Sequence, residues 1–193
     1  MPKFSIFLFL CFVMPRNSFA MDGRDSTILP QQVSKFIPKG YALMDNVRGD
    51  LNLDKYTDIV LVLKKLGEDT ALDATEYKRP ILLLLGHADK TFTLATRNDS
   101  LVYCYQCGGL FGDPYDGVEI KEGSFTVNHF GGSNDRWSNA ITFKYSLADK
   151  KWYLYKIVDK GWSVFNLKKV ETSIRTKKDF GVVLFEKFNS ENY

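Results

Sequence analysis

Oxygen-bearing side chains recur at short, regular intervals between residues 50 and 58. Relative positions 1, 3, 5 and 9 of this stretch are Asp50, Asn52, Asp54 and Asp58, and an apolar run, 59–63, follows at once. Ca²⁺ takes about six to eight oxygen ligands, and a tightly curled loop directs alternate side chains inward while a backbone carbonyl fills a gap. The spacing therefore predicts a Ca²⁺ site in which the Tyr56 carbonyl, at position 7, joins the four side chains.

Two other interpretations of this stretch exist. An EF-hand needs a bidentate Glu at position 12, where this chain has Leu61 inside an apolar run, so a helix-loop-helix site is excluded. An Asp- and Asn-rich turn can instead cap backbone N–H groups and bind no metal, or bind another cation weakly. The prediction is a loop that runs directly into a strand.

The cysteines form a second candidate pair. Cys11 lies in the N-terminal apolar run, which leaves Cys104 and Cys107 as the cysteines of the remaining chain. In an oxidising compartment we expect these two to be bonded to each other. A thioredoxin-like redox pair opens a helix, but three glycines and a proline occupy 108–114 here, so the sequence favours a disulfide that closes a short loop.

Two glycine-rich loops, 108–117 and 129–137, mix aromatic and charged side chains. Such loops carry binding sites when a rigid sheet positions them. The alternative is ordinary turn chemistry, with the aromatic rings packed into the core. The residues that we predict to contact a partner are Asp113, Tyr115, Arg136 and Trp137.

Catalytic and zinc-binding arrangements are weakly supported. The two histidines, His87 and His129, have permissible ligand chemistry for a zinc site with the cysteines but lack paired spacing. His129 with nearby aspartates, or with Ser133, matches no defined catalytic motif. The sequence therefore favours a protein that is not an enzyme.

The N-terminus has the pattern of an export signal. Residues 1–20 contain Lys3, a short apolar run and small residues before Met21, which is typical of a secretory signal peptide. Removing it takes two cations from a formal charge of +3, which leaves +1 and gives no indication of nucleic-acid binding. No apolar run reaches the length of a membrane span. We expect a leader, 1–20, and one β-rich domain, 21–193, in the periplasm or outside the cell.

The elements that must position these residues are mostly strands. After Gly40 the sequence consists of short β-type runs separated by Gly, Asn and Asp, which is typical of antiparallel sheets. Two runs, 59–63 and 81–85, are apolar on both faces and are predicted to be central strands. Weak helical patterns occur at 30–37 and 168–178. The predicted strands are 41–47, 58–64, 80–86, 92–96, 101–104, 117–120, 124–130, 140–145, 152–158 and 182–188.

The pattern D-x-N-x-D-x-x-x-D before an Ile/Val/Leu strand resembles the calcium loop of FG-GAP repeats, found in integrin-α-like β-propellers. The segments FIPKGY, GDLNLDKYTDIVLVLKK, RPILLLLG and CYQCGGLFGDPYDG are similar to a set of exported bacterial proteins with such a loop, which have no assigned activity. The resemblance implies the same five ligands, Asp50, Asn52, Asp54, the Tyr56 carbonyl and Asp58. It also implies a backbone with positive φ at position 6, where this chain has Lys55 instead of Gly.

These observations predict an all-β, mainly antiparallel fold, similar to a propeller blade, with one or two short helices and a Ca²⁺-stabilised loop. The length does not support a complete propeller, because only one such loop is evident. The predicted function is an exported, non-enzymatic binding module whose partner is a protein, peptide or glycan of the cell envelope. The alternatives are an inhibitor or immunity-type protein and a thiol oxidoreductase that uses Cys104 and Cys107.

Overall fold

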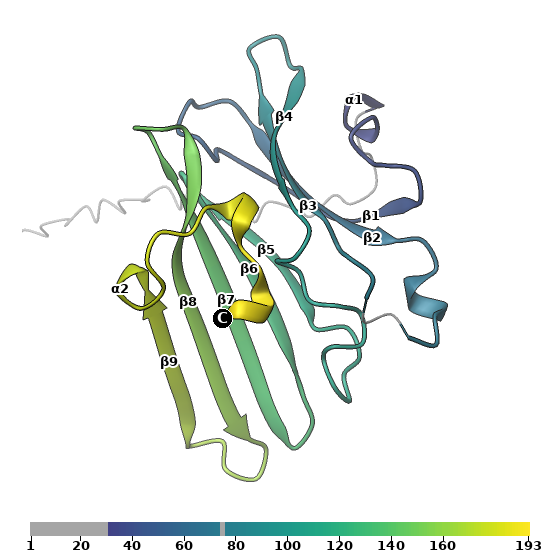
Figure 1. The fold of residues 1–193 in the computed structure, drawn as a ribbon, viewed down its shortest axis with the longest axis vertical. Coiled ribbons are helices and arrows are strands. Elements are labelled where there is room, and N and C mark those ends of the chain that lie inside the picture. Colours follow the sequence, from purple (N-terminus) through teal and green to yellow (C-terminus); the bar gives the residue numbers. More distant parts are fainter. Residues whose placement is uncertain (1–30, 74–75) are drawn as a thin grey trace, which may run out of the picture.

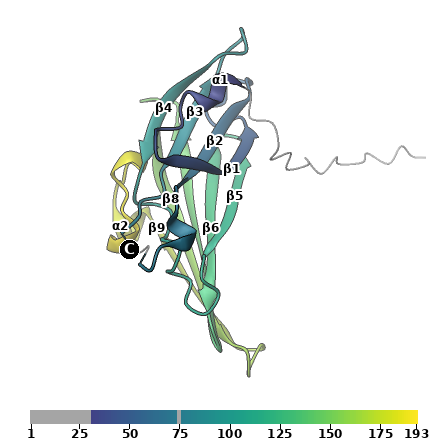
Figure 2. The ribbon, with the colours of Figure 1, turned by 90° about the vertical axis from the view of Figure 1, so that its right-hand side faces the viewer.

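Two antiparallel sheets lie face to face (Figures 1 and 2). The computed structural model describes residues 31–73 and 76–193. The predicted leader, 1–20, lies outside the described residues. Within the described ranges, no helix is long and apolar enough to cross a membrane. The prediction of an all-β, mainly antiparallel fold with short helices is confirmed.

The first sheet has the order β1-β2-β3-β4. Its strands are β1 (Tyr41–Gly49), β2 (Asp58–Lys65), β3 (Ile81–Gly86) and β4 (Phe92–Asn98). As predicted from their apolar runs, β2 and β3 are central strands with both faces buried. One face, with Val60 and Leu83, packs toward the second sheet. The other, with Leu61 and Leu84, packs against Val33 of the short helix α1 (Gln31–Ser34).

The second sheet follows the chain order, β5-β6-β7-β8-β9. Side chains of β6 alternate between buried and half-buried, so one face of the strand enters the core. The predicted turns at 121–123 and 148–151 connect β5 to β6 and β7 to β8. The strands are β5 (Tyr115–Lys121), β6 (Ser124–Gly132), β7 (Asp135–Ser146), β8 (Lys151–Ser163) and β9 (Val170–Thr176).

The C-terminal segment helps to fill the space between the sheets. It contains α2 (Lys177–Phe180) and the 3₁₀ turns η2 (Phe185–Lys187) and η3 (Ser190–Asn192), and it lies over the second sheet (Figure 1, yellow). Phe185 packs edge-on against Phe125 and Phe143, with ring centroids 5.5 and 5.2 Å away. A third 3₁₀ turn, η1 (Glu68–Thr70), follows β2.

Three element predictions are wrong. Residues 101–104 are buried at Leu101 and Val102 but pair with no strand. The segment 182–188 forms only an isolated bridge, Tyr153 to Leu184, because it then turns to bury Phe185. The weak helical pattern at 168–178 suggested a short helix, yet 170–176 form β9, which pairs with β8 along its whole length.

Candidate functional site

The loop between β1 and β2 curls around its own carboxylates. Asp50 Oδ1 accepts a hydrogen bond of 2.6 Å from the Leu53 N–H, and Asp50 Oδ2 accepts one of 2.9 Å from the Lys55 N–H. Leu53 and Lys55 have φ angles of 66° and 71°. The positive φ expected at position 6 is therefore present, although a side chain there costs on the order of 1 kcal/mol relative to Gly.

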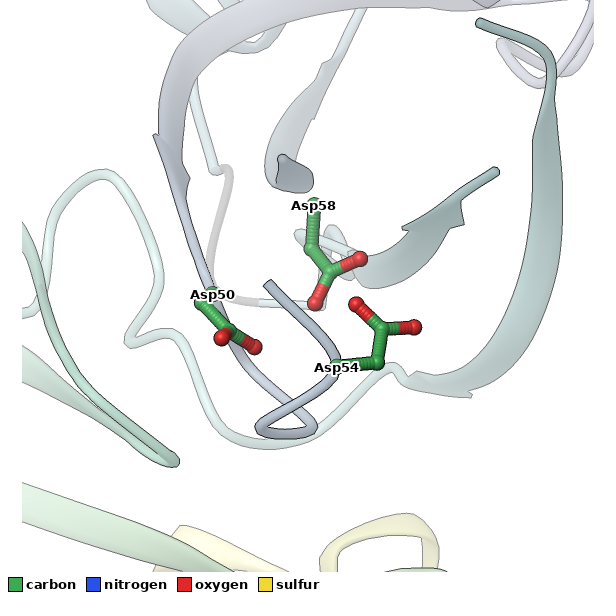
Figure 3. Close-up of side chains that lie close together, drawn as sticks. All are labelled: Asp50, Asp54 and Asp58. Atoms are coloured by element: carbon green, nitrogen blue, oxygen red, sulfur yellow. The ribbon is translucent and has the colours of Figure 1, made fainter. Parts of the chain in front are cut away.

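The three aspartates of this loop point toward one another (Figure 3). One carboxylate oxygen from each of Asp50, Asp54 and Asp58 lies within 4.8 Å of the others. Their exposure differs, because Asp58 is fully buried, Asp50 is half-buried and Asp54 is exposed. The structure thus brings together three of the five predicted ligands as a cluster of oxygen donors that could hold a metal ion.

The buried Asp58 is held by two backbone groups. Its Oδ2 accepts from the Leu51 N–H at 2.7 Å and its Oδ1 accepts from the Gly86 N–H at 2.9 Å. Burial raises the pKa of this carboxyl above its usual range. The two N–H groups oppose that shift, while the charges of Asp54 and Asp50 add to it. A bound cation would offset this repulsion and the lost hydration.

The other two predicted ligands, Asn52 and Tyr56, contact Asp54 through hydrogen bonds. Asn52 belongs to the same loop, where its Nδ2 donates to Asp54 Oδ2 at 2.8 Å and its Oδ1 accepts from the Asp54 N–H at 3.1 Å. The Tyr56 N–H donates to Asp54 Oδ1 at 2.8 Å, and the Tyr56 side chain is exposed. Both residues therefore help to set the conformation around Asp54.

This loop also joins the two sheets. Leu51 is fully buried in the core between them, and its carbonyl accepts a hydrogen bond of 3.1 Å from the indole N–H of Trp152 on β8. The Asp50 carbonyl accepts from the N–H of Gly123, in the β5–β6 turn, at 3.0 Å. The conformation of residues 50–58, which we call the carboxylate loop, is therefore linked directly to the second sheet.

Three connections meet at the opposite end of the second sheet, which we call the loop end: residues 108–112, 131–135 and 163–169. The Leu110 N–H donates to the Gly132 carbonyl at 3.2 Å, and the Gly132 N–H donates to the Gly108 carbonyl at 2.9 Å. The Val164 N–H donates to the Asn134 carbonyl at 2.8 Å. The β6–β7 and β8–β9 connections form the lower end of the molecule in Figure 1.

The loop end exposes several large apolar side chains. The exposed fractions are 84% for Leu110, 45% for Phe111, 82% for Phe165 and 68% for Leu167. The Arg136 guanidinium lies 4.8 Å above the centre of the Phe111 ring. An apolar surface beside a fixed cation is typical of a protein contact site.

The four predicted contact residues separate into different environments. Arg136 lies beside the loop end, over Phe111, whereas Trp137 is half-buried beside Tyr103, with ring centroids 6.0 Å apart. Asp113 accepts from the buried guanidinium of Arg79 at 2.6 Å, and the Tyr115 hydroxyl donates to Asp45 at 2.8 Å. Asp113 and Tyr115 therefore connect parts of the fold to one another.

Phe165 and Leu167 were not identified from the sequence. Neither lies in a glycine-rich or charged motif, and their only signal was an apolar pair between the predicted strand 152–158 and the weak helical pattern at 168–178. Their importance depends on the β8–β9 connection lying beside 131–135, which only the strand pairing shows.

The cysteine prediction agrees with the structure. The sulfur atoms of Cys104 and Cys107 lie 2.02 Å apart, at disulfide distance. Turns follow instead of a helix, and Cys104 is only 7% exposed. The pair closes a short loop at the base of the loop end.

His129 is a buried core histidine on β6. Its ring stacks on Tyr103 at a centroid distance of 4.0 Å, and its Nε2 accepts from the Tyr103 N–H at 3.3 Å. Burial lowers the pKa of His129 from 6.5 to about 4. Its imidazole is therefore neutral at physiological pH.

Comparison of the chain with models of known protein families, with curated proteins and with solved structures finds no match.

Proposed function

We propose that this chain is a non-enzymatic binding module of the cell envelope, which contacts a partner protein through its loop end. The observation that carries the proposal is the meeting of three connections that expose Leu110, Phe111, Phe165 and Leu167 at one end of a rigid sheet. Large apolar side chains left in water are costly, and burying them against a partner recovers that free energy.

In this proposal the carboxylate loop binds Ca²⁺ and thereby stabilises the module. Asp50, Asp54 and Asp58 would hold the ion, with the Asn52 side chain and the Tyr56 carbonyl as the further ligands that the sequence predicts. The ion would supply positive charge that neutralises the carboxylates. Because Leu51 and Asp50 contact the second sheet, binding at this loop would also stabilise the junction between the sheets.

An inhibitor or immunity-type protein is one specific form of this function. The β8–β9 connection protrudes at the lower end in both views (Figures 1 and 2), and its Phe165 is 82% exposed. A protruding apolar side chain suits insertion into a partner's cleft. This feature favours a partner that has a cleft, such as a hydrolase.

The thiol oxidoreductase alternative has less support. Cys104 is buried, and the turns after Cys107 provide no helix N-terminus to stabilise a thiolate. Turnover in an insulin-reduction assay that is lost in Cys104→Ser would overturn the non-enzymatic proposal.

Affinity capture tests the proposed function. The immobilised protein is exposed to envelope extract, and the captured proteins are quantified for the wild type and for the double variant Phe165→Ser, Leu167→Ser. The matched control is Leu72→Ser, Leu94→Ser, which changes two exposed leucines outside the loop end. We expect at least one captured protein that the wild type and the control variant bind and the loop-end variant does not. The melting temperature of the loop-end variant should equal that of the wild type. Equal capture by both variants would refute the proposal.

A further inference from the structure

A second surface, distant from the loop end, has a different chemistry. An open groove of about 970 Å³ lies where the ends of β7, β8 and β9 meet α2. We call it the lysine groove, and its principal lining residues are Lys144, Tyr155, Lys156, Lys177, Lys178 and Val182. The four cations come from three separate elements, so the fold gathers them.

No ion pair among the described residues neutralises the four lysines of the groove. The lysine ion pairs among the described residues involve Lys64 and Lys169, and none involves the four lysines of the groove. Lys144 instead lies 5.6 Å from the centre of the Tyr155 ring.

One carboxylate, Asp149, also lines the groove. Asp149 accepts a hydrogen bond from the Tyr153 hydroxyl, which lies across from Lys144 in the β7–β8 pairing. Asp179 accepts from the Thr176 N–H at 2.7 Å at the start of α2. Glu186 is a second carboxylate close to Tyr153. Because four lysines and one carboxylate line the groove, its lining has a net positive charge.

Apolar surface lies between these cations. Tyr155 is 54% exposed and Val182 is 66% exposed, although both line a concave surface. A ligand that suits this groove needs negative charge at its sides and an apolar group at its centre. The exposed Tyr155 and Val182 therefore favour an acidic protein segment, which carries apolar side chains beside its carboxylates, over a phosphate polymer, which carries none.

We propose that the lysine groove binds an acidic protein segment, whose carboxylates contact the lysines while an apolar side chain lies on Tyr155 and Val182. The charge complementarity would accelerate association and make it sensitive to salt. This site is independent of the loop end, so its failure would leave the proposed function untouched.

Fluorescence anisotropy with a short labelled peptide of alternating Glu and Leu tests the inference. We expect saturable binding that weakens with added salt, and a loss of affinity of more than about tenfold in Lys177→Glu, Lys178→Glu. The matched control is Lys35→Glu, Lys39→Glu, which makes the same charge change on exposed residues near α1 and should bind like the wild type. Melting temperatures of both variants check the fold.

Other outcomes would overturn the inference. One is an absence of binding, and another is equal loss in the groove and control variants. Competition by inorganic polyphosphate or polyuronate that is stronger than competition by unlabelled peptide would assign the groove to a phosphate polymer or a glycan. Unchanged affinity in Tyr155→Ala would show that the apolar centre takes no part, which also contradicts the proposed ligand.

Discussion

The carboxylates of the β1–β2 loop have different roles in the fold. Asp58 is buried and accepts hydrogen bonds from Leu51 and Gly86, so it is needed for the fold with or without a cation. Asp54 is exposed, and its bonds lie within the loop. Removing Asp54 therefore separates metal binding from folding more cleanly than removing Asp58.

We predict that Ca²⁺ raises the melting temperature of the protein and that Asp54→Ala abolishes this increase. A ligand that binds only the folded state adds RT ln(1 + [L]/Kd), about 2.7 kcal/mol at a hundredfold excess over Kd. Differential scanning calorimetry with Ca²⁺ and with chelator provides the measurement. If the two melting curves of the wild type coincide at millimolar Ca²⁺, the loop is an ordinary turn.

His129 gives a prediction about pH. Its pKa falls from 6.5 in the unfolded chain to about 4 in the folded protein, so the unfolded state binds the proton more readily between these values. Stability is therefore complete above pH 6.5 and decreases as the pH falls toward 4, by about 3 kcal/mol from this residue. Urea unfolding at several pH values measures the slope. In His129→Gln, which keeps a polar acceptor, the slope should diminish; an identical slope would contradict the assignment.

At the scale of elements, apolar runs and alternating patterns correctly predicted strands that pair with a strand on each side. The runs 59–63 and 81–85 became the central strands β2 and β3, and the alternation at 141–145 lies in β7. The predictions at 168–178 and 182–188 were wrong for a common reason. Val170 and Ile174 suggested the buried face of a helix, but both are exposed on a strand. The apolar residues of 182–188 suggested a strand, but Phe185 is buried in a 3₁₀ turn.

The connection between the sheets can be tested through Trp152. Its indole N–H donates to the Leu51 carbonyl, and both residues are buried. We predict that Trp152→Phe lowers the free energy of unfolding by about 2 kcal/mol, because a buried carbonyl loses its partner. The same change in half-buried Trp162 should cost less than half as much in urea unfolding. Equal costs would show that the hydrogen bond does not stabilise the junction.

At the scale of the whole molecule, the carboxylate loop and the loop end lie at opposite ends of the second sheet. The carboxylate loop contacts the β5–β6 turn, and the loop end contains the β6–β7 and β8–β9 connections. The carboxylate loop was predictable because its residues lie within nine positions of one another. The loop end was predicted only in part. Residues 108–117 and 129–137 were identified, but Phe165 and Leu167 join them through strand register, which no local pattern encodes.

Site-specific photo-crosslinking tests the account most directly, because it reports contact at a chosen residue inside the cell. A photoreactive amino acid is placed at Phe165 in one strain and at Leu94, an exposed leucine of β4, in another. We predict a discrete protein adduct from position 165 that is absent from position 94. No adduct from position 165, or the same adduct from both positions, would contradict the claim that the loop end binds a partner protein.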